Sequence, residues 1–217
     1  MTVAQIQPPA QQQSATQHQP AGTDVSRMPA RTTAAEPTTY ALPGGLSLFA
    51  IIREDWVTHY RDWTLPGFRA VAVHRLGVWH RTIRFRPLRL IIKRIHLAMY
   101  RYVRNHYGIE LPYTIVLGRR VRIEHQSGIA LHGYSRIGDD CVIRQGVTFG
   151  ICSMDNLYAA PVLGCGVDVG AGAKILGDVV LGDHCRIGAN SVVLCDVPPG
   201  VTVFGIPARV VSENRKI

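Results

Sequence analysis

Apolar residues recur every six positions through the second half of the chain, and this repeat restricts the possible folds more than any other feature. Its members form two runs: Leu111, Leu117, Ile123, Ile129 and, after a two-residue shift, Ile137, Ile143, Phe149; then Leu163, Val169, Ile175, Leu181, Ile187, Val193. An α-helix repeats about every 3.6 residues and a half-buried strand about every two, so neither produces this period. Small residues follow many of the apolar ones, as in Leu117-Gly118 and Ile187-Gly188. The pattern predicts a hexapeptide β-helix, in which each short strand points one aliphatic side chain inward.

The repeat and the composition divide the chain into four segments. We expect a disordered tail over residues 1–45, which contain many Gln, Pro, Ala and Thr and few bulky aliphatic residues. A short α-helical domain is predicted over residues 46–108, a parallel β-helix over 109–210 and a C-terminal tail over 211–217. Residues 151–160 break the six-residue phase inside the β-helix, and a loop that leaves a repeat scaffold often carries binding residues.

The positive charge of the chain is concentrated in the helical segment. The whole chain carries a net charge of +9, whereas residues 47–122 hold fifteen Lys and Arg against four acidic residues, a net charge of +11. Such a patch suits an anionic partner: CoA phosphates, a nucleotide sugar, nucleic acid or an acidic lipid surface. No apolar run reaches the length that spans a membrane, so we expect a cytoplasmic protein. The basic helices could also bring it to the inner face of the membrane.

The third predicted helix, which begins at Pro87 and stops near Gly108, is amphipathic. An apolar stripe at helical spacing contains Leu88, Ile91, Ile92, Ile95, Met99 and Tyr102, and basic residues fall mostly off this stripe. The pattern favours a helix whose stripe packs against the rest of the protein and whose basic face is solvated. The alternative is a face that contacts a membrane surface or an anionic substrate.

Three segments resemble the serine acetyltransferase family of left-handed β-helix acyltransferases. They are residues 170–177 (GAGAKILG), 187–194 (IGANSVVL) and 205–209 (GIPAR), and a weaker similarity continues into residues 67–70 and 74–79. The resemblance implies an all-β left-handed parallel β-helix with a short N-terminal helical domain, and acetyl-CoA as the acyl donor without a metal. It further implies a homotrimer with active sites between neighbouring subunits and no nucleic-acid partner.

The resemblance also assigns roles to individual residues. Glu124-His125-Gln126-Ser127-Gly128 falls on the motif that holds the family's catalytic histidine, so His125 is the candidate general base. Glu110 falls on the carboxylate that orients this histidine, and Glu124 falls on a residue that contacts the substrate. The CoA contacts implied by the resemblance are Gly150, Ala171, Lys174, Ala189 and Arg209. Considered alone, His125 would be interpreted as a surface histidine on a solvated face.

The chemistry of acetyl transfer to a hydroxyl group is consistent with these residues. A base must take the hydroxyl proton as the oxygen attacks the thioester, and histidine suits this task because its ordinary pKa of about 6.5 lies near working pH. Glu110 and His125 are fifteen residues apart, which places them on adjacent coils if each coil contains three hexads, as in the family. A carboxylate next to the imidazole would fix its tautomer and stabilise the imidazolium.

The loop departs from the family pattern. Ala159-Ala160-Pro161 stands where the family has Arg-His-Pro, and Met154-Asp155-Asn156 resembles acetyltransferases of exopolysaccharide operons, such as the colanic-acid type. We therefore predict that Asp155, Asn156 and Tyr158 contact the acceptor, and that the acceptor is a hydroxyl of a sugar or glycan precursor in exopolysaccharide biosynthesis.

Three alternatives remain open. The first is a serine O-acetyltransferase of cysteine biosynthesis. The second is a non-catalytic trimeric scaffold that docks through its basic helices. The third is a zinc carbonic anhydrase, for which about three protein ligands would have to converge. His125, His132 and His184 would be the candidates, but their spacing does not match that family.

Overall fold

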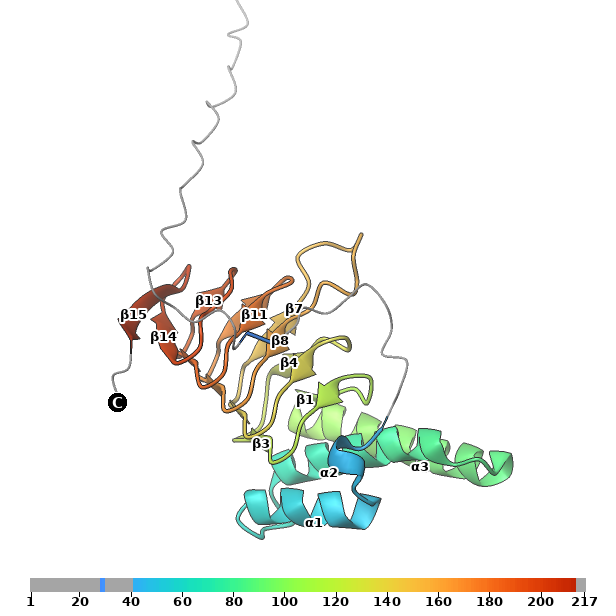
Figure 1. Cartoon of the computed structure of the whole chain (residues 1–217). Helices are drawn as coiled ribbons and strands as arrows, with labels where there is room; N and C mark the ends of the chain where they lie inside the picture. Colours follow the sequence, from blue (N-terminus) through green and yellow to red (C-terminus); the bar gives the residue numbers. More distant parts are fainter. Residues whose placement is uncertain (1–27, 30–40, 214–217) are drawn as a thin grey trace, which may run out of the picture.

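The computed structural model describes residues 28–29 and 41–213 (Figure 1). The tail predicted over residues 1–45 lies largely outside the described residues, although Pro43–Gly45 form a short 3₁₀ helix. The C-terminal tail predicted from residue 211 is shortened, because the last strand, β15, continues through Glu213. No helix in the described part of the chain is both long and apolar enough to cross a membrane.

The second half of the chain is a left-handed parallel β-helix, as the six-residue repeat predicts. Its strands are β1 (Ile109–Glu110), β2 (Val116–Leu117), β3 (Arg122–Ile123), β4 (Ile129–Leu131), β5 (Arg136–Ile137), β6 (Val142–Ile143), β7 (Thr148–Gly150), β8 (Val162–Leu163), β9 (Asp168–Val169), β10 (Lys174–Leu176), β11 (Val180–Leu181), β12 (Arg186–Ile187), β13 (Val192–Val193), β14 (Val201–Phe204) and β15 (Arg209–Glu213). Three sheets run along the helix axis in the orders β1-β4-β7-β10-β13, β11-β8-β5-β2 and β15-β14-β12-β9-β6-β3, and their strands pair in parallel except β15, which pairs antiparallel with β14. We call them sheets A, B and C, and the corners between them the A/B, B/C and C/A edges.

The interior of the β-helix is a column of aliphatic side chains. Ile129, Ile143, Ile175 and Leu181 are at most 1% exposed, and Cys141 and Cys185 occupy equivalent inward positions as small, unpaired core residues. Each coil cannot bury its apolar residues alone, and stacking of the coils produces one continuous core. The β-helix therefore presents its coil edges and outer sheet faces to a ligand.

The two-residue shift in the repeat lies at one edge rather than within a strand. The parallel register pairs Ile123 with Ile143 and Leu131 with Phe149. The chain thus uses eight residues from Ile123 to Leu131 where the next coil uses six. The sequence pattern suggested that the shift follows Ile129, whereas the structure places the additional residues before Ile129, at the C/A edge that contains His125.

Three helices cover the N-terminal end of the β-helix: α1 (Leu48–Thr58), α2 (Pro66–Trp79) and α3 (Arg86–Tyr102). Short helical turns extend α2 (His80–Thr82) and α3 (Val103–Tyr107), and Gly108 ends the latter in the left-handed conformation, with φ of 64°. Figure 1 shows the helices at one end of the coil stack, with α3 projecting away from it. The predicted start of the third helix near Pro87 and its stop at Gly108 are thereby confirmed.

A buried arginine joins the helices to the first coil. The Arg75 side chain, 1% exposed, forms an ion pair with Asp55 of α1 at 2.9 Å and donates hydrogen bonds to the carbonyl oxygens of Leu117 (2.8 Å) and Gly118 (2.6 Å). Burial raises the pKa of the Asp55 carboxyl, and the bonds from Arg75 oppose this effect. Gly67 of α2 also lies against the β-helix: a Cβ there would come within 2.0 Å of the Ile123 carbonyl oxygen. Helix α2 is therefore fixed on β2 and β3.

The apolar stripe of α3 is exposed, which contradicts the favoured prediction that it packs against the protein. Leu88, Ile91, Ile95, Met99 and Tyr102 are 43–58% exposed. The face that α3 buries contains His96, whose Nδ1 lies 3.1 Å from the Val73 carbonyl oxygen, and Val103. Helix α2 covers this second face, so most of the regular apolar stripe stays exposed. Within the stripe, Ile92 is partly buried and the Tyr102 ring lies 5.5 Å from the ring of the core residue Tyr107.

Candidate active site

The C/A edge that contains His125 has a constrained backbone. His125 and Ser127 have φ angles of 66° and 84°, a left-handed conformation that non-glycine residues seldom adopt, and Gly128 follows at 68°. Hydrogen bonds hold the corner from both sides: the Ser127 N–H donates to the Tyr107 carbonyl oxygen at 2.9 Å, and the Ser127 carbonyl accepts from the Gly146 N–H at 3.0 Å. Strain of this kind persists where the surrounding structure enforces it, which is frequent at functional sites.

A pocket of about 810 Å³ lies between this edge and the helical domain. His59, Tyr60, Leu65, Pro66 and Gly67 form the helical wall, and Arg122, Ile123, Glu124, His125, Gln126 and Gln145 form the β-helix wall. The imidazole of His125 is exposed and makes no hydrogen bond or ion pair with any described residue. It is therefore open to a ligand.

Both signs of charge stand next to His125. The Glu124 carboxylate forms ion pairs with Nε of Arg122 at 2.9 Å and with Nε of Arg144 at 3.0 Å. The Arg122 guanidinium also lies 5.6 Å from the centre of the Tyr60 ring. Sequence reasoning predicted Glu124 but missed Arg122, Arg144 and Tyr60. Tyr60 lies more than sixty positions from His125, and only the docking of the helices brings it to the pocket.

The predicted partner of His125 lies on the adjacent coil. Glu110 on β1 pairs with Ala130 of β4, one coil along, and its exposed carboxylate accepts a hydrogen bond from the Tyr100 hydroxyl at 3.5 Å. Within the described chain, no hydrogen bond joins Glu110 and His125. The adjacent-coil placement agrees with the sequence analysis, and the dyad itself stays a prediction.

The residues predicted to contact CoA divide into two groups. Ala171 and Ala189 lie on the same C/A edge as His125: backbone bonds link Ser127 to Gly146, Gln145 to Gly172 and Ala171 to Asn190 along it. Gly150 stands farther around the coil on β7, opposite Leu176.

Lys174 and Arg209 each donate hydrogen bonds to other groups of this chain. The Lys174 ammonium donates to the Gly146 carbonyl oxygen (2.5 Å) and Thr148 Oγ1 (3.0 Å), so it fastens β10 to β7. Arg209, at the far end of the coil stack on β15, donates to the carbonyl oxygen of its neighbour Ala208 at 3.3 Å. Both would have to exchange these bonds for a phosphate.

The predicted acceptor residues lie at a different edge from His125. The loop between β7 and β8 leaves the coil at the A/B edge, where the Tyr158 ring contacts the Tyr134 ring at 4.6 Å. Asp155 accepts from the Ser153 hydroxyl at 2.9 Å, and the Asn156 side chain accepts from the Tyr158 N–H at 3.2 Å. The loop side chains thus stabilise the loop itself, and one chain does not bring them to the His125 pocket.

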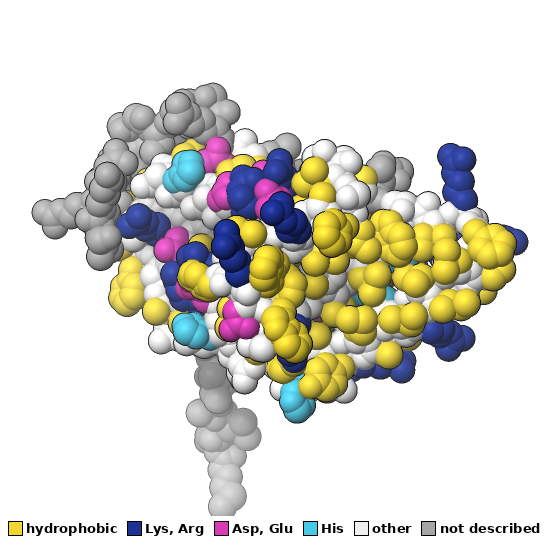
Figure 2. Space-filling view, turned by 90° about the horizontal axis from the view of Figure 1, so that it is seen from below, with side chains coloured by type: hydrophobic (Ala, Val, Ile, Leu, Met, Phe, Trp, Pro, Cys, Tyr) yellow, Lys and Arg dark blue, Asp and Glu magenta, His cyan; other side chains and the backbone are white. Residues whose placement is uncertain are grey.

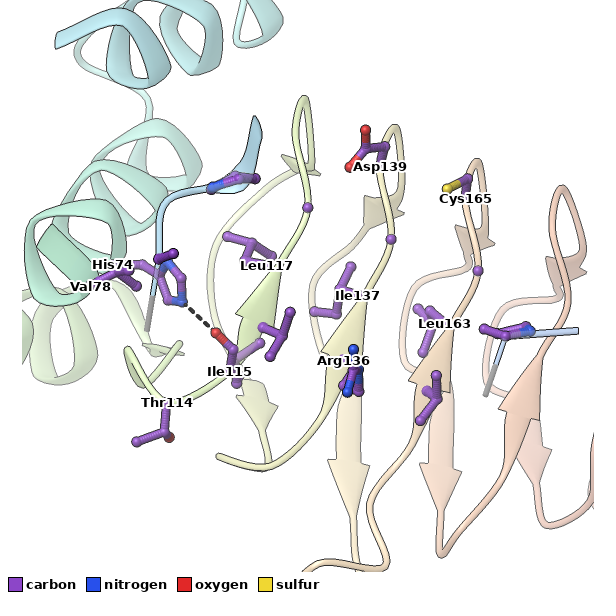
Figure 3. Close-up of a pocket in the computed structure, with 18 of the residues that line it drawn as sticks. His74, Val78, Thr114, Ile115, Leu117, Arg136, Ile137, Asp139, Leu163 and Cys165 are labelled. Carbon is purple, nitrogen blue, oxygen red and sulfur yellow. Dashed lines mark hydrogen bonds between the residues drawn. The ribbon is translucent and has the colours of Figure 1, made fainter. Parts of the chain in front are cut away.

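A second pocket, of about 620 Å³, lies along the outer face of sheet B and the B/C edge (Figure 3). Its carboxylates bind the backbone: Asp139 accepts from the Arg119 N–H and Asp183 from the Cys165 N–H, both at 2.8 Å. They therefore stabilise corners of the coil. Figure 3 also shows His74, whose Nε2–H donates to the Ile115 carbonyl oxygen at 3.1 Å.

The three histidines of the zinc alternative do not converge. His125, His132 and His184 follow strands of sheets C, A and B, so they lie at three different edges of the coil. Among the described residues, no group of three His, Cys, Asp or Glu side chains is arranged to hold a metal.

Comparison with known proteins identifies the family. The bacterial transferase hexapeptide model (six repeats) matches residues 160–195. The serine acetyltransferase of Helicobacter pylori J99 is 37% identical over 150 residues, which cover 69% of this chain and 84% of that protein. The chain belongs to the serine acetyltransferase family. The serine acetyltransferase of Mycobacterium tuberculosis H37Rv is also 37% identical, over 69% of this chain. The match spans 62% of the Mycobacterium tuberculosis protein, which is less than two thirds of its length.

Solved structures agree. Serine acetyltransferase of Brucella abortus S19 in complex with coenzyme A superimposes with a TM-score of 0.66 at 28% identity, over 77% of this chain and 68% of that one. Soybean serine acetyltransferase complexed with serine gives a TM-score of 0.64 at 30% identity, over 76% of this chain and 70% of that one.

These relatives overturn the prediction of a sugar or glycan acceptor. The curated relatives at 37–39% identity are serine acetyltransferases, and so are the structural neighbours. The prediction relied on the missing Arg-His pair at Ala159-Ala160. However, the Ala160 side chain is fully buried, so without a change in the backbone a larger group there would point into the protein rather than toward a substrate. The alanine at position 160 is therefore weak evidence against serine.

His74 generates a prediction for the pH dependence of stability. Burial lowers its pKa to about 3, and its Nδ1 has no partner among the described residues. Below pH ~6.5 the unfolded chain binds a proton on this histidine that the folded chain does not bind until about pH 3, so stability is lost as the pH falls through this window. We expect His74 to contribute a loss of roughly 2 kcal/mol between pH 6.5 and 5. Urea denaturation at several pH values should show that the free energy of unfolding falls less steeply between pH 6.5 and 5 in His74→Gln than in the wild type. The exposed control His184→Gln should match the wild type, and the same pH dependence in all three proteins would contradict the assignment.

Proposed function

We propose that this protein is an acetyl-CoA-dependent serine O-acetyltransferase that serves cysteine biosynthesis. The family supports this proposal, together with a structural neighbour in complex with coenzyme A and another complexed with serine. The observation in this chain that carries it is the pocket in which an exposed histidine, a carboxylate and a guanidinium lie together at His125, Glu124 and Arg122.

The charges of this pocket are complementary to a small zwitterion. Free serine presents an ammonium, a carboxylate and a hydroxyl group within a few bonds. Glu124 can accept from the ammonium and Arg122 can donate to the carboxylate, a charge-assisted pairing that a planar guanidinium makes well. With both charges paired in this way, the hydroxyl is directed toward His125. Arg144 holds Glu124 in place when Arg122 turns to the substrate.

His125 then acts as the general base. Its imidazole takes the hydroxyl proton as the serine oxygen attacks the thioester carbonyl, and the tetrahedral intermediate collapses as the C–S bond breaks. The imidazolium returns the proton to the departing CoA sulfur, so the products are O-acetylserine and CoA thiol. Glu110, on the coil that precedes β4, orients the imidazole by accepting from its second nitrogen once it releases Tyr100.

The C/A edge supplies the path for CoA. Ala171, Ala189 and the glycines at positions 146 and 172 keep this edge free of large side chains, so the pantetheine arm can run along the backbone toward His125. We also propose that CoA contacts Gly150, Lys174 and Arg209. Lys174 and Arg209 would first have to give up their hydrogen bonds to the carbonyl oxygens of Gly146 and Ala208.

We also propose a homotrimer. The catalytic residues lie at the C/A edge and the long loop at the A/B edge of the same coil stack, so one chain leaves Asp155, Asn156 and Tyr158 remote from His125. In a ring of three coils, the A/B edge of one protomer faces the C/A edge of the next. The loop of a neighbour then closes the site, which also gives CoA a second wall.

The catalytic role of His125 predicts a large loss of turnover. In a thiol-release assay with acetyl-CoA and L-serine, His125→Ala should reduce kcat by roughly 10²–10⁴-fold, the usual contribution of a general base. Glu110→Gln should cause a smaller loss because the base remains. The matched control is His184→Gln, an exposed histidine at the B/C edge, which should keep full activity. Near-normal thiol release by folded His125→Ala would refute the assignment.

The serine assignment predicts a selective change in KM. Arg122→Met removes the cation proposed to bind the serine carboxylate, and we expect the KM for L-serine to rise by at least about tenfold while the KM for acetyl-CoA stays within about twofold. Arg136→Met, an exposed arginine on sheet B, is the control and should change neither value. An unchanged serine KM in Arg122→Met would exclude this residue from acceptor binding.

The trimer predicts a mass of three chains in solution. Light scattering of the full-length protein should give three times 23.9 kDa, and crosslinking between the loop and the His125 edge should join different chains. A stable monomer with full activity would contradict a site shared between protomers.

A further inference from the structure

Helix α3 presents a continuous apolar face to solvent. Its exposed residues are Leu88, Ile91, Ile95, Met99 and Tyr102, and the face is extended by Phe85 at the start of the helix, which is 66% exposed. Figure 2 shows apolar side chains gathered over this end of the molecule, with Lys and Arg at the margin. A contiguous apolar face of this kind on a monomer marks an interaction site.

The same helix contains cations and no acidic residue. Arg86, Arg89, Lys93, Arg94 and Arg101 lie within α3, and the whole stretch from residue 63 to 109 contains ten Lys and Arg without an Asp or Glu. None of these five side chains forms an ion pair with a described residue. The surface thus combines apolar side chains with uncompensated positive charge.

Glu110 contacts α3 at the Tyr100 hydroxyl and offsets one of its five positive charges, and the other acids of this segment are occupied elsewhere. Glu54 pairs with Arg119 at 2.7 Å and Asp55 with Arg75 at 2.9 Å, both at the junction of the helices with the first coil. Asp62 accepts from Thr64 at 2.8 Å in the turn after α1. The field at α3 is consequently positive, and an anionic partner is required to compensate for it.

We propose that α3 lies in the interface of an anionic lipid bilayer, with its apolar face among the acyl chains and its cations at the headgroups. A surface-bound helix has this composition: a polar face rich in Lys and Arg and an apolar face of Leu, Ile and aromatic residues. Long Arg and Lys side chains extend toward the headgroups while their stems cover apolar surface. The 17-residue helix lies on the membrane and does not span it.

Charge decides between this occupant and a second copy of the chain. Two α3 helices that met through their apolar faces would cover the stripe but leave ten cations on their outer faces, with no acidic residue on either helix. Such a pair would leave the positive charge of both helices uncompensated. A bilayer of anionic lipid covers the same apolar area and attracts the same cations, at about fivefold in affinity for each basic residue near the surface.

Vesicle flotation of the full-length protein tests the proposal. The protein should float with vesicles of phosphatidylcholine and phosphatidylglycerol, should stay behind with phosphatidylcholine alone, and should be released by high salt. Ile91→Ser with Ile95→Ser should lower the partition coefficient by at least about tenfold, because it removes two large apolar side chains from the buried face. Lys93→Gln with Arg94→Gln should lower it by roughly 25-fold.

The control variant carries the same chemical change at the other end of the molecule. Leu194→Ser with Val210→Ser replaces two exposed apolar residues, 54% and 45% exposed, and should float like the wild type. The α3 variants should retain acetyl transfer between soluble substrates, because α3 contributes no residue to the His125 pocket.

Two results would overturn the proposal. The first is failure of the wild-type protein to bind anionic vesicles, or equal binding to both vesicle types. The second is a smaller assembly mass for Ile91→Ser with Ile95→Ser by light scattering, which would show that the face joins copies of this chain. Neither result depends on whether serine is the acceptor.

Discussion

The contact between Arg75 and the first coil holds the two parts of the protein together. Its guanidinium is buried, and it joins one carboxylate of α1 to two carbonyl oxygens of the β2 strand end. A buried charge is tolerated only where such partners satisfy it, and loss of one partner leaves an uncompensated charge that costs about 3–5 kcal/mol. The contact also sets the position of α2 relative to β3. Because the start of α2 and the end of α1 form one wall of the His125 pocket, the geometry of the site depends on this buried pair.

The repeat gives the protein a rigid frame whose edges differ in use. At the B/C edge, Asp139 and Asp183 bind the backbone of neighbouring corners and stabilise the stack. At the C/A edge, small residues and strained corners leave the backbone accessible, and His125 stands exposed there. The long loop occupies the A/B edge. The proposed trimer brings the loop of one chain to the His125 edge of the next.

The sequence was sufficient to predict those features that leave a periodic or local trace. The six-residue spacing predicted the strands and the inward residues, and Gly108 marked the end of the helical part. The sequence could not predict contacts between residues far apart along the chain, such as those of Arg75 with Leu117 or of Arg122 with Tyr60. The stripe on α3 shows a second limit: helical periodicity identifies an apolar face but does not say whether another element covers it. The acceptor was predicted wrongly because the Ala159-Ala160 substitution was considered without knowing that Ala160 points inward.

The two additional residues before Ile129 show where this architecture accepts change. The strands on both sides keep their register, with Ile123 opposite Ile143 and Leu131 opposite Phe149, and the aliphatic column is uninterrupted. Chain length can therefore vary at a corner without disturbing the hydrophobic interior, because the strands on both sides of the corner keep their positions. New functional groups can therefore be introduced at such corners by the insertion of residues as well as by substitution, while the strands and the hydrophobic core stay unchanged.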